Sequence, residues 1–305
     1  GFVFGLESHI PQAERAELLF TPFVPQLDPA IDPNRPLRDQ VLEGDKLLFY
    51  PYESMTPFLD LVHQAANDDE CISIRITLYR VAKQSRLCES LISAVENGKE
   101  VTVLMELRAR FDEANNIEWA ERLEEAGCTI IYGSEGFKCH SKICQLTYRR
   151  GMAIERITLL GTGNFNEKTA TLYADCGLFT SNPVIVHDLT NLFRTLRGKE
   201  NPRFTRLLVA RFNLIPELNR LIDKEIELAE KGRGGRIILK MNALQDPIMI
   251  DRLYEASQKG VKIDLIVRGI CCLIPGQEYS CNIRVTRIVD SFLEHARIWY
   301  FGNAG

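Results

Sequence analysis

The sequence predicts an α/β fold built from two similar halves, each with a largely parallel mixed sheet flanked by helices. Segments with strand-like alternation take turns with segments of helical periodicity, an order typical of a sheet covered by helices. The phrase LISAVENGKEVTVLMEL at 91–107 also has a counterpart, LYEASQKGVKIDLIVRG, at 253–269, with Gly98 aligned on Gly260. A helix–glycine–strand phrase that recurs once indicates an internal duplication.

The expected elements follow from local signals. Residues 21–45 are rich in proline and predict a linker or extended entry segment, because proline fixes φ and removes a donor. Ser85 and Asp246 are suitable N-caps, and Gly98 is a suitable helix end. The expected strands and helices lie at 71–80 (strand), 85–98 (helix), 100–107 (strand), 111–127 (helix), 128–133 (strand), 217–232 (helix), 235–243 (strand), 246–260 (helix) and 261–269 (strand).

Composition limits the class of protein. The chain has 305 residues, enough for about two domains, and its 45% hydrophobic and 26% charged residues are ordinary for a soluble globular protein. Its apolar runs are shorter than the roughly 20 residues that cross a bilayer. Nine cysteines without a CxxC pair argue against a zinc site and for a reducing cytoplasm. The net charge of −4 means that any polyanion must be held by a local basic patch. The chain begins at Gly1 without methionine, and we expect it to be a fragment of a longer protein.

The stretch FKCHSKICQL at 137–146 alternates like a strand and would place Lys138, His140 and Lys142 on one face. A lone strand histidine is most often a partly buried residue satisfied by one hydrogen bond. Neighbouring lysines, however, disfavour the imidazolium and attract phosphate. A neutral imidazole among cations is what nucleophilic attack on phosphorus requires.

Downstream, TLLGTGNFN at 158–166 offers glycines at 161 and 163 that allow backbone amides to approach an anion, and Asn164 adds a neutral donor. A Gly-x-Gly alone often marks only a turn. Tyr173 is either core packing or a face on which a base stacks. Asp175 is either a surface carboxylate or the acceptor that fixes the tautomer of an imidazole.

Four arginines follow predicted strands, where ligands bind in open α/β sheets: Arg80, Arg108, Arg110 and Arg268. Guanidinium groups make bidentate contacts with phosphate oxygens, although an arginine at a strand end can also serve only to solvate that end.

The second half carries His295 in FLEHARIWYF, 155 residues after His140. Two matching halves, each with a histidine near its end, suggest one site formed between them.

Several long phrases resemble the C-terminal catalytic region of the type 1 polyphosphate kinase family. They include YPYESMTPFLDLVHQA, NGKEVTVLMELRARFDEANNIEWAERLEEAG, KCHSK, GTGNFNEKTATLYAD and LIVRGICCLIPG, and the resemblance runs from about residue 45 to the end. The resemblance implies two phospholipase D-like domains. We expect a remnant of a preceding domain at 1–26, the first phospholipase D-like domain at 27–207, and the second, truncated at its C-terminus, at 208–305.

The resemblance also implies roles for individual residues. His140 matches the phosphorylated histidine, which would take the γ-phosphate of ATP, release ADP and pass the group reversibly to polyphosphate. Tyr173, Arg268 and His295 match nucleotide-contacting positions, and His295 is a candidate general acid and base. The positions of Arg80 and Arg110 are associated with Mg²⁺ and phosphate. Because guanidinium has no lone pair, we expect them to hold phosphate oxygens that in turn bind the metal. Lys142, Asn164 and Asp175 are added from the physical reading of the residues.

Two alternatives remain at this point. One is a phospholipase D-like phosphodiesterase, against which Thr147 counts because it stands where an HxKxxxxD motif has its aspartate. The other is a non-catalytic module or fragment that binds polyanions. For the kinase we expect ATP, ADP and polyphosphate as partners, Mg²⁺ as cofactor, and no nucleic acid. We also expect a homo-oligomeric parent protein, dimeric or tetrameric, of bacterial cytoplasmic type with peripheral membrane association.

Overall fold

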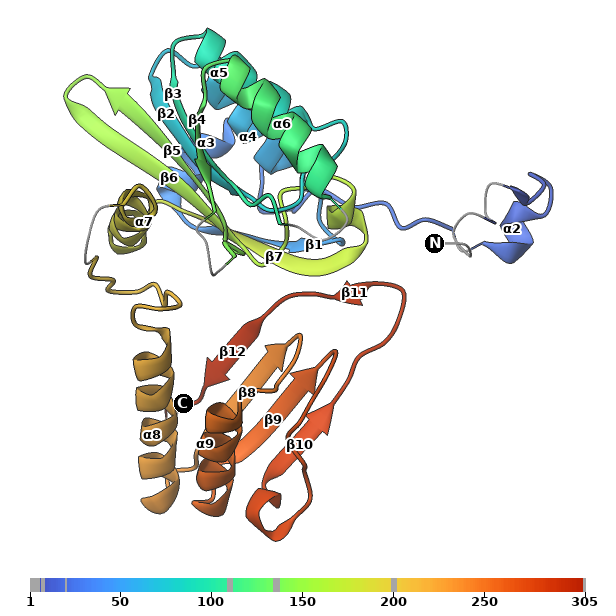
Figure 1. Ribbon diagram of the computed structural model, residues 1–305, viewed down its shortest axis with the longest axis vertical. Coiled ribbons are helices and arrows are strands. Elements are labelled where there is room, and N and C mark those ends of the chain that lie inside the picture. The colour runs from blue at the N-terminus through green and yellow to red at the C-terminus, as the bar shows by residue number, and fades with distance from the viewer. Residues whose placement is uncertain are drawn as a thin grey trace.

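The computed structural model describes residues 6, 9–19, 21–108, 112–133, 138–198 and 202–303. Within these ranges the chain forms two sheets (Figure 1). The larger has the strand order β1-β7-β6-β5-β2-β3-β4, with β11 added to β7, and the smaller has the order β10-β9-β8-β12. We call residues 21–198 the first half and residues 202–303 the second half.

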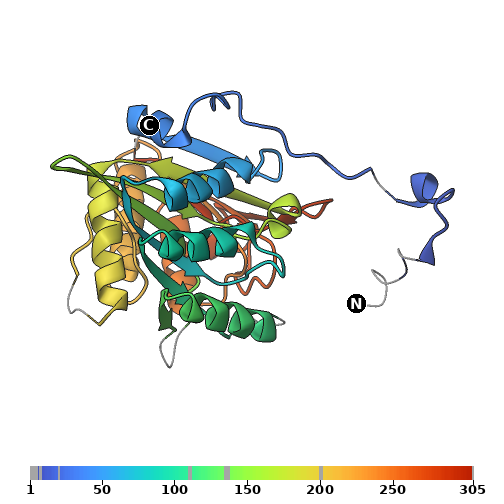
Figure 2. The same cartoon turned by 90° about the horizontal axis from the view of Figure 1, so that it is seen from above.

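The first half contains α3 (Leu37–Glu43), β1 (Lys46–Tyr50), α4 (Thr56–Asn67), β2 (Cys71–Leu78), α5 (Arg86–Glu96), β3 (Glu100–Met105), α6 (Glu113–Glu125), β4 (Thr129–Tyr132), β5 (Lys142–Arg150), β6 (Ala153–Gly161), β7 (Tyr173–Thr180) and α7 (Pro183–Leu196). The second half contains α8 (Leu214–Glu230), β8 (Arg236–Met241), α9 (Pro247–Gln258), β9 (Lys262–Val267), β10 (Ile283–Thr286), β11 (Leu293–Glu294) and β12 (Ile298–Phe301). A short helix, α2 (Arg15–Leu18), precedes them on a segment that extends away from the body (Figures 1 and 2).

The mixed α/β class is as expected, but the strand directions differ between the two sheets. In the second sheet β8, β9 and β10 run parallel and only β12 is antiparallel. In the first sheet β2, β3 and β4 are parallel, whereas β5, β6, β7 and β1 pair antiparallel. The first sheet is therefore mixed, as expected, but among β1 to β7 only its β2-β3-β4 part is parallel. Two residues alone separate β5 from β6, and so tight a connection allows only an antiparallel pair.

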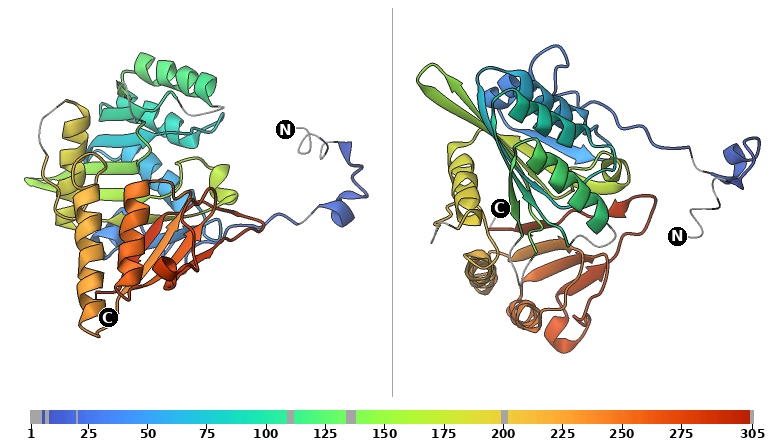
Figure 3. Two further views of the ribbon diagram at one scale, coloured as in Figure 1. Left: turned by 60° about the horizontal axis from the view of Figure 1, so that its bottom comes forward. Right: turned by 45° about the horizontal axis from the view of Figure 1, so that its top comes forward.

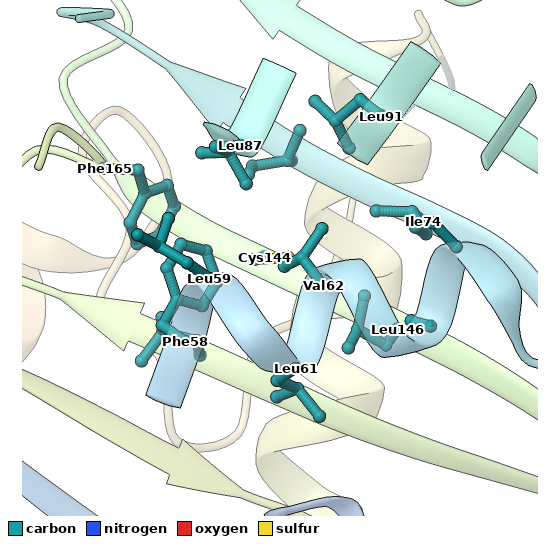
Figure 4. Packing of buried hydrophobic residues seen from close by; sticks show 14 of the residues in the cluster. Phe58, Leu59, Leu61, Val62, Ile74, Leu87, Leu91, Cys144, Leu146 and Phe165 are labelled. Carbon is teal, nitrogen blue, oxygen red and sulfur yellow. The ribbon is translucent and has the colours of Figure 1, made fainter. Parts of the chain in front are cut away.

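Helices cover both faces of the first sheet. On one face α4 and α5 supply apolar side chains to a large core, in which the rings of Phe58 and Phe165 lie 4.7 Å apart (Figure 4). On the other face Leu189 and Phe193 of α7 pack on Ile143. In the second half α8 and α9 pack on β8 and β9 (Figure 3). No helix within the described ranges is both long and apolar enough to cross a bilayer.

The predicted helix boundaries of the repeated phrase are confirmed. The Ser85 side chain accepts a hydrogen bond from the Cys88 amide at 3.2 Å, and Asp246 accepts one from the Met249 amide at 2.9 Å. After both helices a glycine adopts the left-handed conformation that L side chains rarely adopt, with φ of +78° at Gly98 and +91° at Gly260. The two copies thus end their helices with the same device.

Two expectations about local structure are wrong. The proline-rich segment 21–45 contains α3, whose Leu37 and Val41 are buried in the core, so it is more than a linker. The strand expected at 137–146 begins only at Lys142, and residues 134–137 lie outside the described residues. His140 therefore lies in a loop just before β5, and the expected single strand face with Lys138 and Lys142 does not form.

Side-chain hydrogen bonds explain why this loop does not extend the strand. The amide of Cys139 donates to Oε2 of Glu106 at 2.9 Å, and Glu106 is buried at the end of β3. The carbonyl of Ser141 accepts a hydrogen bond from Thr77 Oγ1 at 2.8 Å. Because side chains satisfy these backbone groups, the loop needs no partner strand.

A buried carboxylate anchors the connection between the halves. Asp188 of α7 is fully buried and accepts hydrogen bonds from the backbone amides of Thr205, Arg206 and Leu207, at 2.6–3.0 Å. This cluster of bonds fixes where the chain leaves α7 and so where the second half begins.

We predict that Asp188→Ala lowers the free energy of unfolding by about 3 kcal/mol or more, because the variant loses three amide hydrogen bonds to a buried carboxylate, and each bond to a charged group contributes about 1.5–3 kcal/mol. Urea unfolding measures the loss. The control Asp251→Ala, an exposed residue of α9, should change stability by less than about 0.5 kcal/mol. A loss at Asp188 no larger than that of the control would show that the linker is not anchored there.

Candidate active site

The two halves meet where β11 leaves the second half and pairs in parallel with the start of β7, at Tyr173 and Ala174. The amide of His295 donates to the carbonyl of Ala174 at 3.1 Å, so the backbone pairing continues past the end of β11. Figure 1 shows β11 in the long segment that passes between the first half and the smaller sheet. This pairing carries His295 of the second half into the first.

His295 forms its main side-chain contact with Asp175 of β7. Its Nδ1 lies 2.9 Å from both carboxylate oxygens, and both side chains are buried. Thr162 Oγ1 donates to the same carboxylate at 2.7 Å, and the Tyr173 ring lies 5.3 Å from the His295 ring. A carboxylate on Nδ1 keeps the proton there and leaves the lone pair on Nε2.

Position 163 requires glycine because the Asp175 carboxylate lies directly against its backbone. A Cβ at Gly163 would lie 2.6 Å from Asp175 Oδ2, closer than real Cβ atoms approach other heavy atoms. The close approach that the Gly-x-Gly phrase predicts is thus made to a protein carboxylate. The neighbouring Asn164 is buried, and its Oδ1 has no hydrogen-bond partner among the described residues.

The His140 ring faces the same space. It lies 6.4 Å from the His295 ring and 4.6 Å from the Tyr79 ring, and it remains exposed to solvent. Lys142 Nζ, by contrast buried, lies 2.9 Å from His140 Nδ1 and also donates to the His140 carbonyl. The loop therefore presents an accessible imidazole with a lysine held against its inner nitrogen.

Electrostatics keep this imidazole neutral. Partial burial, together with the positive charges of Lys142 and Arg297, lowers the pKa of His140 to about 3. Burial likewise lowers the pKa of Lys142 to about 7, again with help from Arg297 and against the opposing charge of Asp175. At neutral pH the His140 ring carries no charge and Lys142 is close to its titration midpoint.

Other predicted cations line the same region. Arg80 Nε lies 2.9 Å from Asp112 Oδ2. Arg268 donates from Nε to Asn242 Oδ1 at 3.1 Å, while its Nη1 is buried without a hydrogen-bond partner among the described residues. Arg110 lies outside the described residues.

Sequence reasoning missed Arg297. Its Nη1 donates to the His295 carbonyl at 2.8 Å, and no carboxylate of the described residues lies within 4 Å of its charged nitrogens. Burial lowers its pKa, followed by repulsion from Arg268. The duplication could have revealed it, because Arg297 follows His295 by two positions as Lys142 follows His140. In both copies the cation turns back to donate to the carbonyl of its histidine.

The site does not fit a Mg²⁺ ion held by the protein. Within the described part of the chain no group of three or more His, Cys, Asp or Glu side chains is arranged to hold a metal. Arg80 offers no lone pair, and Asp175 is engaged by His295 and Thr162. The site is instead an assembly of cations and two histidines, with Asp175 as its buried anion.

Fold and site together define a two-part α/β protein in which each half brings a histidine to one cationic site. The family model described as polyphosphate kinase C-terminal domain 1 matches residues 37–202, and that described as polyphosphate kinase C-terminal domain 2 matches residues 207–305. The chain therefore belongs to the polyphosphate kinase family.

Individual relatives agree with this assignment. A polyphosphate kinase of Exiguobacterium sibiricum is 45% identical over 306 residues, covering 100% of this chain and 42% of the relative. One of Staphylococcus epidermidis is 46% identical over 304 residues, covering 99% and 41%. The chain thus spans less than half the length of these curated relatives.

Solved structures show the same relationship. The crystal structure of a polyphosphate kinase from Porphyromonas gingivalis matches with a TM-score of 0.87 and 45% identity, over 97% of this chain and 49% of the other. A phosphatidylserine synthase of Haemophilus influenzae matches with a TM-score of 0.53 and 11% identity, over 85% of this chain and 76% of the other. The second match shows a shared fold alone. Together they confirm the mixed α/β class.

We predict that Gly163→Ala displaces the Asp175 carboxylate from His295 and lowers the free energy of unfolding by about 1–3 kcal/mol, as overpacking typically does. A crystal structure of the variant and urea unfolding measure the two effects. Gly44→Ala is the matched control, because a Cβ there meets nothing within 4 Å, and it should be neutral. An unmoved carboxylate and equal stabilities would refute the close approach.

Proposed function

We propose that the protein containing this chain is a polyphosphate kinase, which transfers the γ-phosphate of ATP reversibly, through a phosphohistidine at His140, to the end of a polyphosphate chain. The observation that carries the proposal is the neutral, exposed His140 ring set among cations and facing His295 of the other half. Family membership supports the same activity.

His140 has the properties of a nucleophile for phosphorus. Because its pKa lies near 3, the ring keeps a lone pair throughout the neutral range. The surrounding cations offset the charge that an approaching phosphate brings, and the transfer itself needs positioning and charge neutralisation more than elaborate bond chemistry. The nitrogen–phosphorus bond would retain much of the transfer potential of ATP, which suits a reversible reaction.

His295 is proposed as the acid and base for the leaving oxygen. Asp175 holds its Nδ1 at 2.9 Å, which directs Nε2 toward the reacting groups. Asp175 belongs to the first half and His295 to the second, so this proton-transferring pair exists only when β11 is paired with β7.

Three residues are proposed to contact the nucleotide. Tyr173 is only partly buried and presents an aromatic face on which a base can stack. Arg268 has a buried donor, Nη1, that a phosphate oxygen would satisfy. Asn164 has a buried Oδ1 without a partner in the described part of the chain, which can accept a hydrogen bond from a nucleotide hydroxyl or a bound water.

Phosphate oxygens are proposed to lie between Arg80 and Arg297, one from each half. Arg110 remains a prediction, because its position is outside the described residues. Since these residues do not fit a protein-held ion, Mg²⁺ would enter as the ATP complex, coordinated by the phosphates of the substrate. We therefore expect the protein to need Mg²⁺ as part of its Mg–ATP substrate and not as an ion bound by its own side chains.

Four further expectations stay predictions. They are the domain limits of 1–26, 27–207 and 208–305, the dimeric or tetrameric parent protein, its cytoplasmic location with peripheral membrane association, and the absence of nucleic acid among its partners.

We predict that His140→Ala in the complete protein abolishes labelling by ATP radiolabelled at the γ-phosphate. The wild-type protein should carry acid-labile, base-stable phosphate on His140, located by mass spectrometry. His63→Ala, an exposed histidine of α4, is the matched control and should label normally. Phosphate on a serine or an aspartate would reject the mechanism. Cleavage of a phosphodiester without labelling would favour the phospholipase D-like alternative.

We also predict that Arg297→Met slows phosphorylation of His140 about 100-fold, the scale of removing one preorganised donor from a transition state. Arg284→Met is the control, because Arg284 is an exposed arginine of the same half whose Nε bonds Asp264 at 2.7 Å. Rapid-quench kinetics measure both, and added guanidinium should partly restore the Arg297 variant. Equal rates for the two variants would show that Arg297 contacts no substrate.

A further inference from the structure

The contact between Lys142 and His140 raises a question of proton placement that the proposed function leaves open. Lys142 Nζ lies 2.9 Å from His140 Nδ1, so one of the two nitrogens donates and the other accepts. If Lys142 donates as an ammonium, Nδ1 carries the lone pair and Nε2 carries the hydrogen of the neutral ring. That ring has no free lone pair, because one nitrogen is blocked by the lysine and the other is protonated.

The opposite arrangement gives a reactive ring. A neutral Lys142 amine has one lone pair and two hydrogens. The lone pair can accept Nδ1–H, and one hydrogen can be donated to the His140 carbonyl, which the same Nζ also contacts. Nε2 then holds the lone pair. The observed pair of contacts is therefore satisfied by a neutral amine, and only this arrangement leaves a nucleophile.

We propose that the Lys142 amine accepts the Nδ1 proton of His140 as Nε2 attacks the γ-phosphorus, and that it returns this proton when the phosphoryl group leaves. This inference rests on the proposed function and assigns Lys142 a proton-transfer role, beyond that of a cation near phosphate. Lys142 is suited to it because it is buried, and its Nζ lies 4.9 Å from the centre of the Tyr79 ring, which restricts the approach of bulk water.

The step balances. The Nε2 lone pair forms the N–P bond, and the bond from phosphorus to the bridging oxygen breaks with its electron pair on ADP. The ring would become a cation, but Nδ1–H passes to Lys142, which leaves a neutral phosphohistidine beside an ammonium. In the second transfer a terminal oxygen of polyphosphate attacks phosphorus, the N–P electrons return to Nε2, and Lys142 gives its proton back to Nδ1.

The surroundings of Lys142 favour the neutral amine before ATP binds. Arg80, at the end of β2, and Arg297, between β11 and β12, disfavour its charge, while Asp175 of β7 and the Cys139 thiol of its own loop favour it. The nearest titratable neighbour, His140, is uncharged at neutral pH. Bound triphosphate adds negative charge and raises the pKa of Lys142 in the complex. The phosphorylation rate should therefore rise with pH, with a midpoint at or above about 7.

A fixed-charge role predicts the opposite behaviour. If Lys142 served only as a cation for phosphate, the rate would fall as pH rises through the titration of the lysine, and arginine would replace it well. Arginine keeps the charge but cannot accept a proton. Arg297, already present in the equivalent position of the second half, supplies the permanent charge.

Single-turnover phosphorylation of the complete protein by γ-labelled ATP, from pH 6 to 9, tests the proposal. The wild-type rate should rise up to tenfold per pH unit and then level off. Lys142→Arg should lose at least about 100-fold at pH 8, the scale of a general-base contribution, with little change in ATP affinity. Lys259→Arg is the control, an exposed lysine paired with Glu230 at 2.8 Å, and should behave as wild type.

Two further measurements keep the test decisive if Lys142→Arg folds poorly. Lys142→Ala should be rescued by methylamine, and the rescue should grow with the fraction of unprotonated amine. In protein with ¹⁵N-labelled histidine, the NMR signals of His140 should show the Nδ1–H tautomer at pH 8 and lose it in Lys142→Arg.

A wild-type rate that falls with pH, a Lys142→Arg variant within threefold of wild type, or an Nε2–H tautomer at pH 8 would each overturn the proposal. So would a folded Lys142→Ala variant that no amine rescues. If the wild-type protein takes no label at all, the proposed function fails instead, and the tautomer measurement still decides where the proton lies.

Discussion

The pairing of β11 with β7 is the constraint on which the site depends. It is a short stretch of parallel backbone hydrogen bonds, yet it moves His295 from the second half onto the Asp175 carboxylate of the first. A buried imidazole and a buried carboxylate are each costly to desolvate alone, so their contact at 2.9 Å stabilises the very pairing that brings them together. The short β11–β7 pairing and the His295–Asp175 contact thus stabilise each other and fix the position of His295.

Positive charge is concentrated at this junction although the chain as a whole carries −4. Burial, followed by the charge of Arg297, lowers the pKa of Lys142, and burial, followed by the charge of Arg268, lowers that of Arg297. Such an arrangement costs stability in the absence of a ligand and favours a polyanion that neutralises it. Nη1 of Arg268, which is buried and has no hydrogen-bond partner in the described residues, is a further group that a bound polyanion would satisfy.

The duplication gives the two halves the same local plan and different chemistry. In each, a cation two residues after the histidine donates to that residue's carbonyl. In the first half it is a lysine, which can gain and lose a proton, and in the second it is an arginine, which cannot. In the first half the partner of Nδ1 is an amine, and in the second it is a carboxylate. The pair of histidines is therefore suited to two different tasks at one site.

The sequence by itself determined the features that depend on interactions between residues close together in the chain. Helical periodicity, the caps at Ser85 and Asp246, and the left-handed glycines at 98 and 260 depend on residues a few positions away, and they are where the pattern places them. A site shared by the two histidines could also be anticipated, because the repeat placed one histidine in each half, whereas for Asp175 the sequence left a surface carboxylate equally open.

Only the tertiary structure decided the rest. Strand direction in the first sheet, the loop that holds His140 through Glu106, and the contact that requires Gly163 all depend on groups far away in the chain. Arg297 lowers the pKa of Lys142 because β11 of the second half pairs with β7 of the first. Long-range pairing selects one of the many arrangements that local propensity allows. The burial and the neighbouring charges that result lower the pKa values of His140 and Lys142.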